Sequence, residues 1–295
     1  MNRILVTGAS GFIGKHLIPR LRGIGHEVIE NNSQSGDVWK EATWSRIPRA
    51  DVVVHLAGKT FVPDSWRDPG AFVKCNLLGT VAALNYCRMH KARMIFLSSY
   101  LYGNPQSLPI PETAPLVANN PYALSKKLAE EACRFYAHSF DIEIAILRPF
   151  NVYGPGQSED FLIPCIIRQV VDGKEIKVRS LTPKRDYVHV SDLVEAIIKC
   201  VAVKQRLSIF NIGTGKSHSV GELIQIIQGI KKTNLTVISS GEERQDEIMD
   251  TVADVSLARS ALGWQPRWSL GRGISSLLGE RPGKAGIEGL TAPSF

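Results

Sequence analysis

The sequence predicts an α/β protein built around a doubly wound parallel sheet. Short apolar runs without polar alternation recur through the first half of the chain, which is typical of strands buried on both faces of a parallel sheet. Segments with helical periodicity separate these runs. The first run ends in a glycine-rich turn that opens the first helix. Strands and helices that alternate in this way indicate a doubly wound fold.

The expected elements follow in chain order. The predicted strands are Arg3–Thr7, Glu27–Ile29, Val52–Leu56, Met94–Ser98 and Ile142–Leu147. The predicted helices between them are Gly14–Gly23, Ala71–Met89 and Tyr122–Phe140. After about Pro149 the sequence becomes rich in turn residues, and a helix at Cys165–Val171 and short strands at Tyr187–Val190 and Ile209–Ile212 follow.

This change predicts a second, smaller mixed α/β lobe. We assign residues 1–148 plus 185–212 to the main domain and residues 149–184 plus 213–295 to the lobe. The final segment, ERPGKAGIEGLTAPSF, lacks helical periodicity and is expected to be a loose tail.

Composition removes several classes of function. With 44% hydrophobic and 21% charged residues, the 295-residue chain is typical of a globular protein. No apolar run approaches the ~18 residues that a membrane span needs, and the glycines of MNRILVTGASGFIG argue against a signal peptide, so we expect a cytoplasmic protein. The five cysteines show no CxxC pair and the seven histidines no ligand spacing, so no metal is expected.

The net charge of +7 does not indicate nucleic-acid binding. The basic residues are dispersed, and no cluster exceeds pairs such as Lys126-Lys127 and Lys231-Lys232. A basic surface of this kind suits an anionic small substrate instead.

The segment ILVTGASGFIG predicts a phosphate-binding turn. Its glycines, Gly8, Gly11 and Gly14, permit a tight turn and close approach of the backbone to a pyrophosphate. The helix that follows offers free N–H groups and the positive end of its dipole. The sequence therefore predicts a Rossmann-type dinucleotide site, with Ser10, Phe12 and Ile13 also beside the cofactor.

The end of the second strand favours NAD over NADP. A carboxylate there can accept the ribose hydroxyls, and Glu30 has no basic neighbour in the sequence before Lys40. The register could also place Asn32 at this position, so both residues are cofactor candidates.

Tyr122 and Lys126 are the candidate acid–base pair. They are four residues apart on a helix that Asn120 and Pro121 begin, so they share one face. A free phenol titrates near ~10, too high for a base at neutral pH. We expect the nearby ammonium and an oxidised nicotinamide ring to lower that pKa, so that Tyr122 can exchange a proton with a sugar hydroxyl.

With these residues the sequence resembles the extended short-chain dehydrogenase/reductases of the nucleotide-sugar epimerase/dehydratase group. The resemblance covers roughly residues 3–270. It rests on the order of the motifs TGASGFIG, DVVVHLAGK, CNLLGT, SSYLYG, YALSK, RPFNVYGPG, RDYVHVSDL and FNIGTG. It implies that the main domain binds NAD and that the lobe binds a UDP-, dTDP- or GDP-linked sugar, in a homodimer formed through residues 71–89 and 122–140.

The resemblance also implies roles for single residues. Those beside the cofactor would be Asp37, Val38, Leu56, Ala57, Gly58, Lys59, Asn76, Tyr122, Lys126 and Pro149. Those beside the substrate would be Ser98, Ser99, Asn151, Leu162, Arg185 and Arg244. Only a few residues separate the second strand from Asp37, so the adenine edge of the site is shorter than in most of the family.

The segment FLSSYLYG bears on the reaction. Counting back from Tyr102-Gly103 gives Ser98 the catalytic Ser/Thr place, Ser99 the place of an acid and Tyr100 the place of a glutamate base in 4,6-dehydratases. A neutral phenol is a poor replacement for that base, so dehydration is disfavoured.

Two enzymatic reactions and one other function remain. We favour a 4-epimerase, in which hydride leaves C4, the 4-keto sugar rotates and hydride returns to the other face; the Lys in HLAGK is similar to UDP-galactose 4-epimerases. The alternative is an NAD(P)H-dependent reductase of a nucleotide-linked 4-keto-6-deoxy sugar, which the short adenine edge favours. An NAD(H)-binding redox sensor would be expected to have lost Tyr122 or Lys126.

Overall fold

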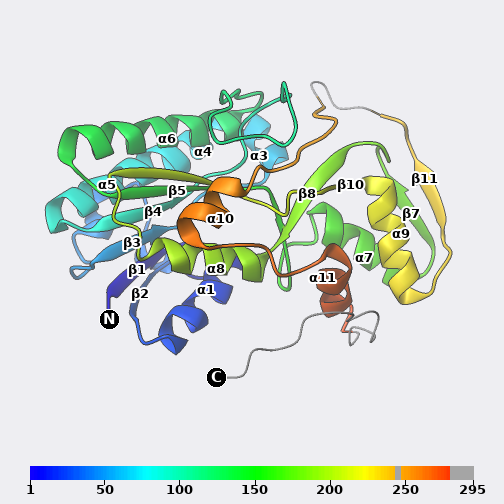
Figure 1. Cartoon of the computed structure of the whole chain (residues 1–295), viewed down its shortest axis with the longest axis horizontal. Helices are drawn as coiled ribbons and strands as arrows, with labels where there is room; N and C mark the ends of the chain where they lie inside the picture. Colours follow the sequence, from blue (N-terminus) through cyan, green and yellow to red (C-terminus); the bar gives the residue numbers. More distant parts are fainter. Residues whose placement is uncertain (243–246, 280–295) are drawn as a thin grey trace.

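The computed structural model describes residues 1–242 and 247–279. Its centre is a six-stranded parallel sheet with strand order β2-β1-β3-β4-β5-β9, as Figure 1 shows. The strands are β1 (Arg3–Thr7), β2 (Glu27–Asn31), β3 (Val52–His55), β4 (Arg93–Leu97), β5 (Ile144–Pro149) and β9 (Leu207–Ile212). The predicted doubly wound Rossmann-type fold is thereby confirmed.

Helices cover both faces of the sheet because alternate strand residues are apolar on both sides. In β1, Ile4 belongs to the core formed with α1 (Phe12–Gly23) and α8 (Val190–Cys200). Its neighbour Leu5 belongs to the core formed with α5 (Gly79–His90) and α6 (Pro121–Phe140). The first pair of helices lies below the sheet in Figure 1 and the second pair above it.

The helix expected at residues 71–89 is divided. The chain forms α4 (Pro69–Phe72), a π-helical turn η2 (Val73–Leu78) and then α5. Asn76 lies in the π-helical turn with 1% of its surface exposed, and its amide bonds to the backbone of Lys59 and to Ser125. Single π-turns inside α-helices are frequent at functional sites. Three short helices precede this region: η1 (Ser33–Ser35), α2 (Glu41–Trp44) and α3 (Val62–Arg67).

The smaller lobe lies beside the carboxyl ends of the strands (Figure 1). Its sheets contain β6 (Asn151–Tyr153), β8 (Lys184–His189) and β10 (Ser217–Ser219), and separately β7 (Glu175–Val178) and β11 (Thr236–Ser239). They pack with α7 (Leu162–Asp172), α9 (Val220–Lys231) and α11 (Leu270–Leu277) around a separate core. The remaining helix, α10 (Ser256–Leu262), packs against β9 and α8.

One predicted boundary differs from the structure. β8 pairs with β6 and β10, so residues 185–189 are not in the central sheet that we expected them to join. Residues 187–189 pair instead with Asn151–Tyr153 of β6, in the sheet of the smaller lobe. The division into a cofactor domain and a substrate lobe stays a proposal. The predicted tail at residues 280–295 lies outside the described residues.

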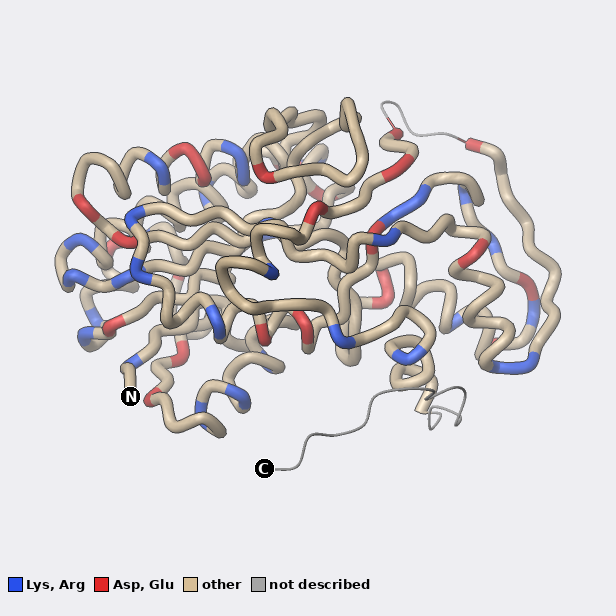
Figure 2. Tube along the Cα trace, viewed as in Figure 1, with Lys and Arg blue, Asp and Glu red and all other residues tan. Residues whose placement is uncertain are grey.

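Charge is interspersed over the molecule. Figure 2 shows Lys and Arg alternating with Asp and Glu along both lobes. Across the described ranges, no helix has the length and apolarity to cross a bilayer. In the same ranges no three His, Cys, Asp or Glu side chains group as metal ligands.

Candidate functional site

The glycine turn between β1 and α1 forms a cradle that has no room for side chains. A Cβ on Gly8, whose φ is 68°, would lie 2.8 Å from the Ala57 nitrogen, and one on Gly14 would lie 2.5 Å from the Ala9 oxygen. Gly11 caps α1 without a side-chain hydrogen bond, so the first N–H groups of the helix keep their capacity for a ligand. Ser10 is exposed on the turn, while Phe12 and Ile13 pack on the core. This arrangement fits the pyrophosphate of a dinucleotide.

The segment after β3 is fixed beside this cradle. The Thr7 hydroxyl lies 2.8 Å from His55 Nδ1 and accepts a hydrogen bond from the Ala57 N–H. The Lys59 N–H donates to Asn76 Oδ1 at 2.8 Å, and a Cβ on Gly58 would lie 3.0 Å from the same oxygen. The Lys59 amine lies 5.9 Å from the centre of the Phe72 ring. The structure therefore brings the predicted residues 56–59 and Asn76 to the edge of the cofactor cradle.

On the adenosine side, the structure pairs Glu30 with a basic residue of α1. Its carboxylate lies 2.7 Å from Arg22 Nη2, on the α1 side of β2. This ion pair is exposed, so Glu30 stays a cofactor candidate whose carboxylate has a protein partner in the structure. Asn32 follows at that edge, where its side-chain oxygen caps η1 by accepting the Gln34 N–H.

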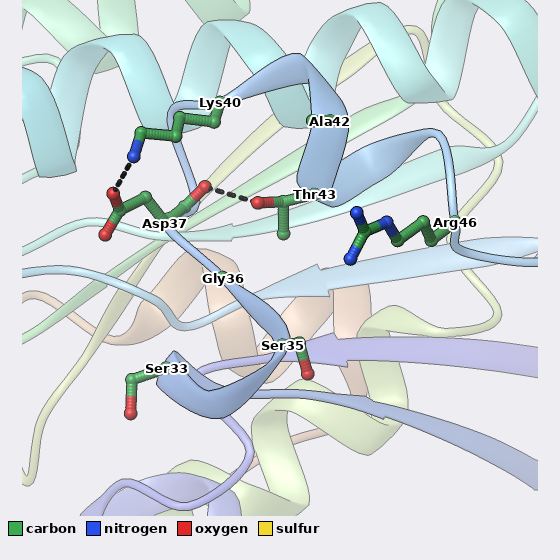
Figure 3. Close-up of a pocket in the computed structure, with 8 residues that line it drawn as sticks. All are labelled: Ser33, Ser35, Gly36, Asp37, Lys40, Ala42, Thr43 and Arg46. Carbon is green, nitrogen blue, oxygen red and sulfur yellow. Dashed lines mark hydrogen bonds and ion pairs between the residues drawn. The ribbon is translucent and has the colours of Figure 1, made fainter.

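A cavity of about 240 Å³ lies between η1 and α2, as Figure 3 shows. Asp37 lines it and is paired with Lys40 at 2.7 Å, while the Thr43 hydroxyl donates to the Asp37 carbonyl. Val38 is buried against Gly79. Asp37 and Val38 are therefore adjacent to a recess, but the Asp37 carboxylate already has a partner.

Helix α6 carries the candidate acid–base pair. It begins at Pro121 with the Asn120 side chain accepting the Ala123 N–H, as predicted. The Lys126 amine donates to the Leu97 carbonyl at 2.5 Å and lies 4.3 Å from the centre of the Phe96 ring. Burial lowers the pKa of Lys126 to about 8.

The Tyr122 phenol is protonated at neutral pH in this structure. Burial raises its pKa to about 12, and the neighbouring Ser99 hydroxyl acts in the opposite direction. The lowering that we expected from Lys126 does not occur in this geometry, because that amine is directed to the Leu97 carbonyl.

The role predicted for Ser98 disagrees with the structure. The Ser98 hydroxyl donates to Glu130 Oε1 at 2.5 Å and is buried away from Tyr122. Successive side chains at a strand end alternate in direction, so Ser99 is the one that meets Tyr122. The structure therefore makes Ser99, rather than Ser98, the candidate hydroxyl beside Tyr122.

Ser98 belongs to a buried polar network that the sequence analysis missed. Glu130 and Arg148 form an ion pair at 2.6 Å, with at most 1% of either side chain exposed. Arg148 also donates to the Tyr102 hydroxyl, which donates in turn to Asn211 Oδ1. The position of Glu130, four residues after Lys126 on the same helix, was the available signal.

On the substrate side, the predicted polar residues already have protein partners. Asn151 Oδ1 accepts a hydrogen bond from the Tyr100 hydroxyl at 3.1 Å, and its amide nitrogen donates to the Asp186 carbonyl at 3.3 Å. Arg185 pairs with Glu247 and donates to the Ile248 carbonyl. The structure does not show either side chain free to bind a diphosphate.

The remaining predicted residues fall at the rim or outside the described chain. Leu162 begins α7 and is 36% exposed. Pro149 ends β5, and its carbonyl accepts the Tyr100 N–H. Arg244 lies outside the described residues. The sequence analysis missed Tyr100 as a contact residue, because its position was considered only as one that lacks a glutamate.

Comparison with known proteins identifies the family of the chain. Residues 4–213 match the family model "NAD dependent epimerase/dehydratase family". A GDP-6-deoxy-D-mannose reductase of Pseudomonas aeruginosa is 30% identical in an alignment that covers 94% of this chain and 96% of the relative. A UDP-glucose 4-epimerase of Mycolicibacterium smegmatis is 30% identical in an alignment that covers 94% of this chain and 97% of the relative.

A solved structure shares the whole architecture. MoeE5, in complex with UDP-glucuronic acid and NAD, is 30% identical with a TM-score of 0.86, over 94% of this chain and 98% of that one. The family match spans the glycine cradle, Tyr122, Lys126 and the central sheet. The chain is thus an enzyme of the NAD-dependent epimerase/dehydratase family, within the extended short-chain dehydrogenase/reductases, and NAD is its family's cofactor.

Proposed function

We propose that the chain transfers a hydride at C4 of the sugar in a nucleotide-diphosphate sugar. The observation that supports this is the Tyr122 phenol beside Ser99, at the carboxyl edge of the sheet that also carries the glycine cradle. When bound, NAD accepts or supplies the hydride. Tyr122 exchanges a proton with the C4 oxygen, Ser99 holds that oxygen by a hydrogen bond, and Lys126 fixes the start of α6 against β4.

Reduction of a 4-keto sugar is the direction that the site supports best. A carbonyl oxygen must receive a proton as C4 becomes an alcohol, and a phenol with a pKa of about 12 holds that proton at neutral pH. One relative is named GDP-6-deoxy-D-mannose reductase, which is consistent with this direction. The proposed substrate is therefore a nucleotide-linked 4-keto-6-deoxy sugar, reduced by NADH or NADPH.

The 4-epimerase favoured by the sequence analysis is the second candidate. Its support is the placement of Lys59 beside the cofactor cradle and the relative named as a UDP-glucose 4-epimerase. Epimerisation begins with removal of a proton from the C4 hydroxyl, which requires Tyr122 as phenolate. The positive charge of an oxidised nicotinamide would have to lower its pKa for that step.

The two candidates are separated by supplying each with its own substrate. The purified protein is incubated with the 4-keto form of GDP-6-deoxy-D-mannose and NADH or NADPH, and the loss of reduced nicotinamide absorbance is recorded. In parallel, UDP-glucose is supplied without added cofactor and UDP-galactose is measured by NMR. The proposal expects oxidation of the cofactor in the first assay. UDP-galactose in the second assay alone would establish the epimerase, and activity in neither would contradict C4 hydride transfer with these nucleotides.

We also propose that the chain forms a homodimer through α5 and α6. Leu124, Leu128 and Phe135 are exposed on α6 at positions that share one helix face, and Met89 is exposed at the end of α5. Light scattering after size exclusion should give twice the chain mass for the wild type and the single mass for Phe135→Lys. A wild-type monomer would contradict the dimer without affecting the proposed reaction.

A further inference from the structure

Tyr100 occupies the position between the acid–base residue and the substrate lobe. It follows Ser99 at the end of β4, and the electrostatic influence of its phenol reaches both Tyr122 and Tyr187 of β8. Its hydroxyl donates to Asn151 of β6. A sugar whose C4 oxygen meets Tyr122 and Ser99 therefore lies next to the Tyr100 ring.

The Tyr100 side chain is fixed at both ends. Its ring is stacked on Phe150, with ring centres 5.0 Å apart and planes 15° apart. Its hydroxyl is held by Asn151, which is itself held by the Asp186 carbonyl at 3.3 Å. Its backbone N–H donates to the Pro149 carbonyl. Stacking and hydrogen bonds together keep this ring from swinging aside when a ligand enters.

The adjacent Tyr187 hydroxyl gives an independent indication of a ligand. Tyr187 is 5% exposed, and among the described residues its hydroxyl has no hydrogen-bond partner. Leaving a buried hydroxyl without a partner is energetically unfavourable, so such groups usually have a function. A hydroxyl group of a bound sugar would satisfy it.

We propose that Tyr100 is a specificity-determining residue that holds the sugar in one orientation and so limits hydride transfer to one face of C4. This inference rests on the proposed reaction. As the ketone is reduced, C4 gains a hydride from the reduced nicotinamide and its oxygen gains the Tyr122 proton. The ketone would become a secondary alcohol, with the hydride and its two electrons supplied by the reduced cofactor, which is left as its positively charged oxidised form, and Tyr122 would recover a proton from solvent. The other C4 epimer forms only if the sugar turns over, and the fixed Tyr100 ring opposes that turn.

The test is the ratio of the two C4 epimers formed from the 4-keto form of GDP-6-deoxy-D-mannose and reduced cofactor, measured by proton NMR. The wild type should give one epimer. Tyr100→Ala should remain active and raise the share of the second epimer at least about tenfold, which corresponds to about 1.4 kcal/mol between the two faces. Tyr100→Phe keeps the stacked ring but loses the Asn151 bond, so its ratio should lie between the two.

Tyr136→Ala is the matched control. Tyr136 lies in the last turns of α6, several turns after Tyr122, and its hydroxyl bonds to Asn85 of α5. This variant should keep the wild-type ratio. A loss of stereochemical control in both alanine variants would assign the effect to general loosening of the fold and would overturn the proposal.

Two further results would also overturn it: a single epimer from Tyr100→Ala, or both epimers in comparable amounts from the wild type. If the wild type reduces nothing, the proposed reaction fails, and the inference is then tested by a crystal structure with UDP-glucose bound. A hexose packed against the Tyr100 ring, with the Asn151 bond intact, would support the inference. A hexose lying away from that ring would contradict it.

Discussion

Ser98 and Ser99 are adjacent in the chain, yet they belong to two different regions of the molecule. Ser98 is directed into the protein, where its hydroxyl bonds to Glu130 of the buried ion pair with Arg148. Ser99 is the serine whose side chain influences the pKa of Tyr122, beside Tyr100. We call these regions the buried network (Ser98, Tyr102, Glu130, Arg148 and Asn211) and the phenol site (Ser99, Tyr100, Tyr122, Asn151 and Tyr187).

The two regions differ in whether their buried polar groups have hydrogen-bond partners. In the buried network the guanidinium of Arg148 is bonded to Glu130, to the Tyr102 hydroxyl and to the Glu112 carbonyl. In the phenol site one buried hydroxyl, that of Tyr187, has no partner among the described residues. A satisfied network rigidifies the strand end, while unsatisfied groups beside it can bind a ligand. Variants of the two regions should therefore fail in different ways.

The largest effect is expected from Tyr122→Phe. Removing the hydroxyl removes the proton donor, so turnover should fall by about 10³-fold, within the usual range for a positioned acid–base group. Binding of NADH, followed by its fluorescence, should persist because the glycine cradle is untouched. Turnover within tenfold of wild type would show that another group handles the proton.

Arg148→Met should act on stability. It leaves the Glu130 carboxylate buried without its ion-pair partner, which costs about 3–5 kcal/mol of unfolding free energy. Urea unfolding at neutral pH measures this loss. Arg168→Met, which breaks the exposed pair with Glu159, is the control and should leave the urea midpoint unchanged. Equal effects of the two substitutions would contradict the importance of the buried network.

Lys126 should make stability depend on pH in a predictable direction. Burial lowers its pKa from 10.5 to about 8, so between these values the unfolded chain binds more protons than the folded chain. The unfolding free energy should therefore rise with pH across this window, by up to about 3 kcal/mol relative to Lys126→Met. Urea unfolding of both proteins at about pH 8 and about pH 10 checks the slope. A difference that stays constant with pH would mean that the amine is not buried.

The smallest effect is expected from Tyr187→Phe. Its hydroxyl has no partner in the described structure, so removing it should not lower the free energy of unfolding. If the sugar satisfies that hydroxyl, KM should rise by about tenfold while kcat changes little, the mark of a group that binds substrate and transition state alike. A loss of stability with an unchanged KM would assign Tyr187 to the fold instead.

Local patterns predicted much of this molecule correctly. Each strand of the central sheet has a predicted counterpart, because strands buried on both faces must be continuously apolar. The capped start of α6 and the glycine cradle were also predictable, since each depends on residues within a few positions of one another.

Contacts between distant segments could not be predicted in this way. The direction of Ser98 depends on Glu130, 32 positions away, and a shift of one residue at a strand end reverses which side chain faces the site. Arg185 pairs with Glu247, 62 positions away, and the sequence around either residue does not indicate the other as its partner. Glu30 pairs with Arg22 across the α1–β2 turn, although the sequence analysis looked for basic neighbours only after it.

The most direct test is to compare Ser99→Ala with Ser98→Ala, measuring kcat/KM and the free energy of unfolding for both. Ser99→Ala should lose about 10²-fold in kcat/KM, because it removes a hydrogen bond to the reacting oxygen, and should keep the wild-type stability. Ser98→Ala should lose about 2 kcal/mol of stability, because it removes a hydrogen bond to the buried Glu130 carboxylate, and should keep most of its turnover. The reverse pattern, with activity lost in Ser98→Ala and stability lost in Ser99→Ala, would contradict the division into a buried network and a phenol site.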